Sequence, residues 1–251
     1  MEYSLNTIGL YPDLNTEETV KAALAHGYKT FECWLVSAEE IAEICRMEQE
    51  YGIRFSTIVV RHNILNVPEE REKYLAALET LMQDMQGIST RTIITTVGQD
   101  SGAPRKEQHA SIVEGLRAAV PLCEKYGITL LVEPLNTVKD HVGYYLDSSA
   151  EGFEIIREVN SPYIRLLFDI YHQLQMGEDV LPIIRENLDL IGHFHVAAIP
   201  ERDEKLWDVA DYTPILSFIR ACGTKAPVGI ELFPTAPDGS DKVLEELKRF
   251  L

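Results

Sequence analysis

The chain has 251 residues, 45% of them hydrophobic, so it can bury a large core as one domain of the size that α/β barrels reach. A formal net charge of −17 argues against a nucleic-acid partner, because phosphates require a basic surface. No apolar run approaches the roughly 18 residues of a membrane helix, and the N-terminus lacks a signal-peptide pattern. The four cysteines form no C-x-x-C pair. We therefore expect a soluble, cytoplasmic protein with a single domain, residues 1–251, reduced thiols and no membrane partner.

Short apolar runs alternate with amphipathic stretches along the whole chain. The expected strands are Ser4–Leu10, Tyr28–Leu35, Ile53–Val60, Thr92–Val97, Thr129–Val132, Ile164–Ile170, Ile191–Val196 and Val228–Phe233. Capping boxes at Asn15 and Ser37 begin the first two helices, Ser148 with Glu151 is expected to cap a later one, and glycines such as Gly127 follow helix ends. The expected helices run from Asn15 to Gly27, Ser37 to Gly52, Pro68 to Gln86, Pro104 to Tyr126, Ser148 to Val159, Asp179 to Leu188, Thr213 to Gly223 and Ser240 to Leu251.

Eight strand-then-helix units in about 250 residues predict a single (β/α)8 TIM barrel. A doubly wound open sheet also alternates strands and helices. However, neither a dinucleotide fingerprint nor a phosphate-binding glycine loop follows any expected strand, so the barrel is the better interpretation.

Four of the later strands end in a group that can bind a metal ion. These groups are Glu133, Asp169, His195 and Glu231, and the active sites of TIM barrels lie at this end of the strands. A single carboxylate at a strand end is more often a cap or an ion-pair partner. Four potential metal ligands at equivalent strand ends, however, predict that they share one divalent cation. Three carboxylates and one imidazole suit Mn²⁺ or Mg²⁺, or Co²⁺ in vitro. His193 shares a strand face with His195 and should lie deeper in the barrel.

Four further side chains are candidates for substrate binding. His172 follows Asp169 by three residues, and it is either a loop histidine or a donor to a substrate oxygen. Arg202 is a clamp for an anion or hydroxyl group, or a solvated loop residue. His62 is a weaker candidate after the third strand, and Trp34 is either an apolar wall of the site or part of the core.

A cation flanked by two glutamates suits proton transfer next to a carbonyl group. The cation would stabilise an ene-diolate, while Glu133 and Glu231, on strands five and eight, remove and return the proton from opposite sides. Return to the neighbouring carbon interconverts an aldose and a ketose, and return to the opposite face of the same carbon gives an epimer.

The strand-end motifs resemble those of xylose isomerase-like TIM barrels, and within them the hydroxypyruvate isomerases and the tagatose and psicose type of ketose 3-epimerase. The matching segments are Val132–Asn136, Phe168–His172, Gly192–Ala197 and Gly229–Glu231. The resemblance implies Glu133, Asp169, His195 and Glu231 as metal ligands, with the two glutamates as the acid/base pair. It also implies that His172 and Arg202 contact the substrate.

The resemblance favours a hydroxypyruvate isomerase-like enzyme acting on a small sugar or hydroxy-keto acid. A ketose 3-epimerase is the alternative, because the isomerase group usually has glutamine where His195 stands and histidine follows the epimerase pattern. In addition, Asp203 replaces the histidine that normally follows the loop arginine. A dehydratase on the same scaffold is less favoured. An abasic-site endonuclease is the least favoured, because its zinc site needs many histidines at the strand ends and this chain has only seven histidines in all. Self-association, common in such barrels, is expected by analogy.

Overall fold

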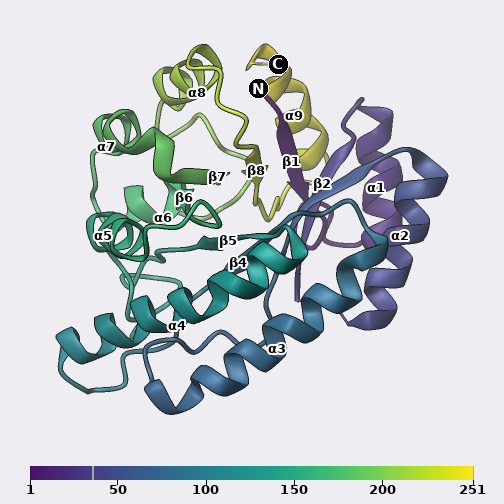
Figure 1. The fold of residues 1–251 in the computed structure, drawn as a ribbon. Helices are drawn as coiled ribbons and strands as arrows, with labels where there is room; N and C mark the ends of the chain where they lie inside the picture. The colour runs from purple at the N-terminus through teal and green to yellow at the C-terminus, as the bar shows by residue number, and fades with distance from the viewer. Residues whose placement is uncertain (36, 251) are drawn as a thin grey trace.

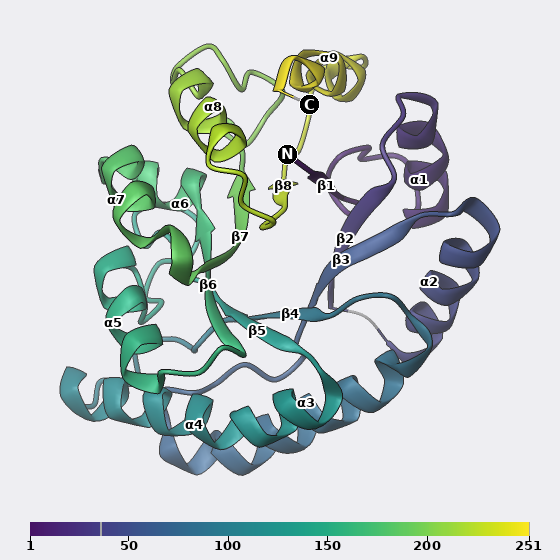
Figure 2. The same cartoon turned by 45° about the horizontal axis from the view of Figure 1, so that its top comes forward.

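The computed structural model describes residues 1–35 and 37–250 and shows a closed barrel of eight parallel strands that are paired in chain order (Figures 1 and 2). The strands are β1 (Tyr3–Asn6), β2 (Thr30–Leu35), β3 (Arg54–Val59), β4 (Thr92–Thr95), β5 (Thr129–Val132), β6 (Ile164–Asp169), β7 (Ile191–Val196) and β8 (Val228–Ile230). Pairing of β1 with β8 closes the ring, and both views place the chain ends together beside these strands.

Helices surround the barrel on the outside (Figure 2). They are α1 (Thr16–Ala25), α2 (Ala38–Tyr51), α3 (Arg71–Asp84), α4 (Arg105–Tyr126), α5 (Ser149–Val159), α6 (Ile170–Gln175), α7 (Val180–Asn187), α8 (Thr213–Ala221) and α9 (Gly239–Leu247), with short 3-10 turns at Pro68–Glu70, Met85–Gly87, Leu188–Leu190 and Lys248–Phe250. None of these described helices is both long and apolar enough to cross a membrane. The predicted (β/α)8 TIM barrel is confirmed.

Local helix signals in the sequence are reproduced by the structure. Asn15 and Ser37 both form complete capping boxes with the glutamate three residues on. Gly52 and Gly127 end their helices in the left-handed conformation, which glycine adopts without steric cost. The expected end of the last helix, Leu251, lies outside the described residues.

The sequence interpretation extended the first strand to Leu10 and the last to Phe233, whereas β1 ends at Asn6 and β8 at Ile230. It was also wrong about two helices. Ser148 makes no side-chain cap; instead the Ser149 N–H and hydroxyl at the start of α5 donate to the carboxylate of Glu178, which lies in the next unit of the barrel. The six-residue α6 was also not expected. It begins directly after β6, and Asp169, the last strand residue, caps it by accepting from the N–H groups of Tyr171 and His172.

The apolar core has two parts. A large continuous layer fills the space between the strands and the helices. A small cluster of Ile94, Leu131 and Leu167 packs inside the barrel, against Val59. Polar groups share the barrel interior, where the Ser4 and Ser56 hydroxyls lie 2.6 Å apart. The two layers hold the strand ends at one edge of the barrel, which is the edge that carries the candidate site.

Candidate functional site

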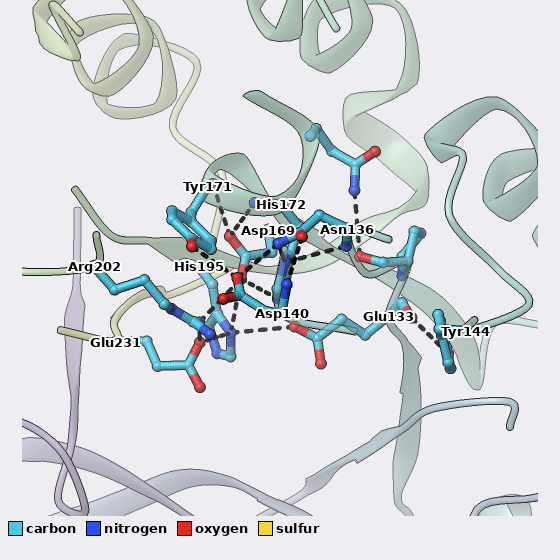
Figure 3. Close-up of polar contacts among 12 residues, drawn as sticks. Glu133, Asn136, Asp140, Tyr144, Asp169, Tyr171, His172, His195, Arg202 and Glu231 are labelled. Carbon is cyan, nitrogen blue, oxygen red and sulfur yellow. Dashed lines mark hydrogen bonds and ion pairs between the residues drawn. The ribbon is translucent and has the colours of Figure 1, made fainter. Parts of the chain in front are cut away.

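The four strand-end residues predicted to share a metal ion converge at the mouth of the barrel. Glu133 directly follows β5, Asp169 ends β6, His195 lies near the end of β7, and Glu231 directly follows β8. Asp169 and His195 are paired across β6 and β7, so their side chains begin at the same height. Figure 3 shows the three carboxylates arranged around the imidazole of His195.

His195 Nδ1 is the atom that the three carboxylates share. It lies 3.5 Å from Glu133 Oε1, 3.5 Å from Glu231 Oε2 and 3.9 Å from Asp169 Oδ2. All four residues are buried. Asp169, His195 and Glu231 form one group that could hold a metal ion, and Glu133 joins Asp169 and His172 in a second, overlapping group.

Three atoms of this cluster, Asp169 Oδ2 and both ring nitrogens of His195, are buried without a hydrogen-bond partner among the described residues. Asp169 Oδ1 accepts from the backbone N–H of Tyr171 at 2.8 Å, whereas Asp169 Oδ2 faces the cluster and has no aligned donor. His195 Nδ1 is likewise unpaired. Buried polar atoms in native proteins nearly always have a partner, so an unpaired pair of potential ligands is a mark of a binding site.

Burial and neighbouring charges shift the ionisation of the cluster. Burial raises the pKa of Glu231 to about 7, even though the charges of Arg202 and His195 act in the opposite direction. Burial alone would lower the pKa of His195, but the charges of Glu32 and Glu231 hold it well above its ordinary value. For Asp169 the surrounding charges also outweigh burial, and its pKa is lowered.

Arg202 reaches into the same cluster from the loop between β7 and α8. Its backbone has a φ of 58°, which is uncommon for a residue with a side chain. Two hydrogen bonds hold it there: the Arg202 N–H donates to Ala198 O, and the Phe233 N–H donates to Arg202 O, both at 2.7 Å. The guanidinium group stacks 4.6 Å from the Tyr171 ring centroid and donates to Glu231.

His172 has a defined orientation and tautomer. Its Nδ1 accepts from the backbone N–H of Asn136 at 3.2 Å and lies 2.7 Å from the Asn136 side-chain nitrogen. The neutral ring must therefore carry its proton on Nε2, which lies 3.4 Å from Asp169 Oδ2. Because burial lowers the pKa of His172, the ring favours this neutral, N–H-donating form.

A cavity of about 380 Å³ opens above the cluster. Five of the residues predicted to form the site line it: Trp34, Glu133, His172, Arg202 and Glu231. Asp169 and His195 do not line it but lie against its charged members. The apolar part of the wall consists of Ile8, Trp34, Val59 and Leu135.

The structure does not bring His62 to this cavity. Its Nε2 lies 3.2 Å from Glu70 Oε2, and the neighbouring Asn63 lines the cavity instead. Thr96 and His141 are the other polar lining residues that the sequence interpretation missed. Thr96 directly follows β4. It could have been found by the rule that active-site residues of TIM barrels follow the carboxyl ends of the strands (the strand-end rule), whereas His141 lies within a long loop that carries no such signal.

Below the cluster, inside the barrel, lies a second set of buried polar groups. Glu32 on β2 contacts two histidines of β7: Glu32 Oε2 is 3.0 Å from His193 Nε2, and Glu32 Oε1 is 3.1 Å from His195 Nε2. Burial would raise the pKa of Glu32, but the two histidines lower it to about 2. His193 precedes His195 on β7 and contacts the same carboxylate, so it lies deeper in the barrel, as its alternation along the strand predicts.

Comparisons with known proteins agree with this architecture. The family of xylose isomerase-like TIM barrels matches residues 20–251. The 2-oxo-tetronate isomerase of Cupriavidus necator is 29% identical over 72% of this chain and 73% of its own. The hydroxypyruvate isomerase of Escherichia coli is 27% identical over 67% of this chain and 65% of its own. A crystal structure of a family 2 AP endonuclease from Brucella melitensis shares the fold, with a TM-score of 0.90 at 20% identity, and covers 99% of this chain and 98% of its own.

Proposed function

This chain belongs to the xylose isomerase-like TIM barrel family and is an enzyme of the isomerase class, and we propose that it acts on a small α-hydroxy carbonyl compound with the help of one divalent cation. The observation that carries the proposal is the pair of buried glutamates, Glu133 and Glu231, that line one cavity on both sides of His195 Nδ1.

The side chains present fit such a cation. Ligands about 2.1 Å from a metal ion in octahedral geometry lie about 3 Å apart, and Nδ1 of His195 is 3.5 to 3.9 Å from the three carboxylate oxygens. Asp169 Oδ2 and His195 Nδ1 also lack a hydrogen-bond partner within the described part of the chain. Three oxygen donors and one imidazole favour Mn²⁺ or Mg²⁺, with Co²⁺ as a substitute, and Glu133, Asp169, His195 and Glu231 would hold the ion.

A cation held by these residues would polarise a substrate carbonyl group and so make the neighbouring C–H more acidic. The chain's own residues supply the proton transfer. Glu133 and Glu231 approach the cavity from β5 and β8, so one can remove the proton beside the carbonyl and the other can return it.

Two more side chains would orient the substrate. His172 presents an Nε2–H group, which can donate to a carbonyl or hydroxyl oxygen. Arg202 can pair with a carboxylate through two of its N–H groups. Hydroxypyruvate, named in one relative above, has a carboxylate beside an α-hydroxy carbonyl group, which matches this set of donors. We therefore favour a short hydroxy-keto acid as the substrate.

A ketose 3-epimerase is the second candidate. The same two carboxylates would then return the proton to the opposite face of the carbon from which it was removed. The observation in its favour is His195, since the resemblance assigns histidine at this position to the epimerases.

The test is a panel of hydroxypyruvate, tetruloses and hexuloses incubated with the Mn²⁺-loaded enzyme in deuterated water. We expect reversible isomerisation of the hydroxy-keto acid, deuterium at the carbon beside the carbonyl, and loss of activity with EDTA that Mn²⁺ or Co²⁺ restores. Inversion at carbon 3 of a ketose would favour the epimerase. Full activity in exhaustively chelated protein, or turnover without exchange into any substrate, would contradict the proposal.

A further inference from the structure

We propose that Glu32 is a positioning residue for the candidate metal site, acting through His195. The Glu32 carboxylate would accept a hydrogen bond from the Nε2–H group of His195. This contact would turn Nδ1, with its lone pair, toward Glu133, Asp169 and Glu231. The inference rests on the proposed function, because it assumes that these four residues bind a cation.

The first support is the position of Glu32 on the far side of the His195 ring from the carboxylate cluster. Its Oε1 lies 3.1 Å from Nε2, while Nδ1 on the opposite side of the ring faces Glu133 and Glu231 at 3.5 Å. Neither Glu32 Oε1 nor His195 Nε2 makes an aligned hydrogen bond with any atom of residues 1–35 and 37–250, and the 3.1 Å contact between them is an ion-pair contact. Each atom is therefore the nearest partner available to the other.

The second support is the hydrogen-bonding capacity of a carboxylate. An ionised carboxylate only accepts, so a ring nitrogen that faces it keeps its proton. The other oxygen of Glu32 is 3.0 Å from His193 Nε2, which makes the carboxylate a common acceptor for two histidines of one strand. With Nε2 of His195 held in the protonated form, Nδ1 is the nitrogen left to offer a lone pair to a cation.

The third support is steric. Gly229 on β8 is paired with His195, and a Cβ atom there would lie 2.5 Å from His195 Cδ2 and 2.6 Å from Glu32 Oε1. Contacts this short are not tolerated, so any side chain at position 229 would push the Glu32–His195 pair apart. The absence of a Cβ at Gly229 leaves the space in which the two side chains meet.

Glu32, His193 and His195 could instead hold a second ion, since their ligand atoms lie within 4.8 Å of one another. We favour hydrogen bonding because Glu32 Oε2 and His193 Nε2 already form a hydrogen bond at 3.0 Å, which an ion between them would break. A second ion would also require the imidazole of His195 to bridge two cations. The number of ions bound per chain distinguishes the two arrangements.

The experiment compares the wild type with Glu32→Gln by calorimetric titration of the chelated protein with Mn²⁺ and by the visible spectrum of the Co²⁺-loaded protein. Glutamine keeps the size of the side chain, but it cannot accept from both histidines, since its nitrogen donates. We expect one ion per wild-type chain and an affinity lowered about 10- to 100-fold in the variant, as for other residues that orient a ligand. The Co²⁺ spectrum should change as well, because the nitrogen ligand is misplaced.

Glu48→Gln is the matched control. Glu48 accepts from the Phe55 N–H and from Ser89, far from the cluster, so its variant should keep the wild-type affinity for Mn²⁺. Gly229→Ala should weaken Mn²⁺ binding like Glu32→Gln, and thermal unfolding without metal shows whether each variant is folded. Wild-type affinity in a folded Glu32→Gln protein, or two ions per wild-type chain with one lost in the variant, would overturn the positioning role. A wild type that binds no Mn²⁺ would instead contradict the proposed function itself.

Discussion

Asp169 shows how one side chain can serve both the fold and the proposed metal site. One carboxylate oxygen caps α6 by accepting from two backbone N–H groups, and this bond fixes the rotamer. The other oxygen is thereby directed at His195 and left without a hydrogen-bond partner among the described residues. A cap at a strand end and a metal ligand are therefore not competing roles for this residue, because each uses a different oxygen.

The glutamate pair gives the sharpest prediction at the residue scale. Glu133→Gln and Glu231→Gln should each lower kcat by at least about 10²- to 10⁴-fold, because an amide cannot transfer the proton. Steady-state kinetics measures the loss, and an unchanged unfolding temperature shows that the fold is kept. Glu48→Gln serves as the control with normal turnover. A Glu231→Gln enzyme with more than a tenth of wild-type kcat would refute the two-carboxylate mechanism.

The strand-end rule accounts for how much of the site could be predicted from the sequence. Glu133, Asp169, His195 and Glu231 follow buried apolar runs, and a parallel barrel necessarily brings such positions to one edge. His62 illustrates the limit of the rule. It lies beyond the end of β3, where the chain has left the strand geometry, and a shift of one residue places Asn63 at the cavity instead. His141 and the contact of Glu32 with His195 depend on tertiary packing, which no local pattern encodes.

At the scale of elements, two loops are joined above the cavity. Lys139, in the loop after β5, lies 2.7 Å from Glu201 and also donates to Pro200 O, in the loop that carries Arg202. The Tyr171 hydroxyl connects the same loops, since it donates to Asp140 at 2.7 Å and contacts Pro200 O at 3.4 Å. The position of Arg202 is thus fixed from outside its own loop.

Lys139→Ala should therefore affect substrate binding more than stability. Exposed ion pairs contribute about 0.2–1 kcal/mol to folding, so the free energy of unfolding should change little. Loosening of the Arg202 loop should raise KM for a carboxylate substrate several-fold while kcat stays within about twofold. Lys73→Ala, which removes a comparable exposed pair with Glu70 on the barrel exterior, is the control. Equal KM values for the two variants would show that the link between the loops has no role in binding.

The contact between α4 and α5 predicts a pH dependence of stability. His109 lies 3.0 Å from Glu151 and 3.1 Å from Glu158. Burial lowers the pKa of His109, but hydrogen bonds to the two glutamates outweigh it, so the pKa in the folded state is raised. The stabilisation is then fully present below the unfolded-state pKa of about 6.5 and is lost as the pH rises through the folded-state pKa.

We expect His109→Gln to reduce the free energy of unfolding by about 0.5–1 kcal/mol at pH 6 and by clearly less at pH 9. Urea titrations of the wild type and the variant at the two pH values measure the difference. Arg71→Gln, which removes an ion pair without a histidine, should show no such dependence on pH over this range. A cost for His109→Gln that is the same at both pH values would contradict the assigned shift.

Helix signals were more predictable than the connections that follow the strands. Capping boxes and left-handed glycines act through neighbours a few residues away, so the sequence alone contains the needed information. The start of α5 depends on Glu178, about thirty residues further along the chain, and the sequence pattern indicated Ser148 in its place. Helix α6 was missed because its six residues are too few to show a helical repeat.

At the scale of the whole molecule, barrel closure turns sequence order into spatial convergence. The pairing of β5, β6, β7 and β8 in chain order sets residues from Glu133 to Glu231 along one arc of the rim. The pairing of β1 with β2 and with β8 brings Glu32 beneath the same cluster. The arrangement of the candidate site therefore depends on the closed barrel rather than on any single loop.

The net charge of −17 adds a requirement for any metal-binding experiment. An acidic surface attracts divalent cations nonspecifically, and salt screens this attraction at exposed sites much more than at a buried one. Binding to the candidate site should therefore persist at about 0.5 M salt, at which weak surface binding is lost.

The most direct measurement is the anomalous scattering of manganese in a crystal soaked with Mn²⁺ at high salt. We expect one strong peak at the barrel mouth, about 2.0–2.4 Å from Glu133, Asp169, His195 Nδ1 and Glu231. A peak between Glu32 and His193, a peak only on the surface, or no peak with the four side chains turned away from one another would contradict it.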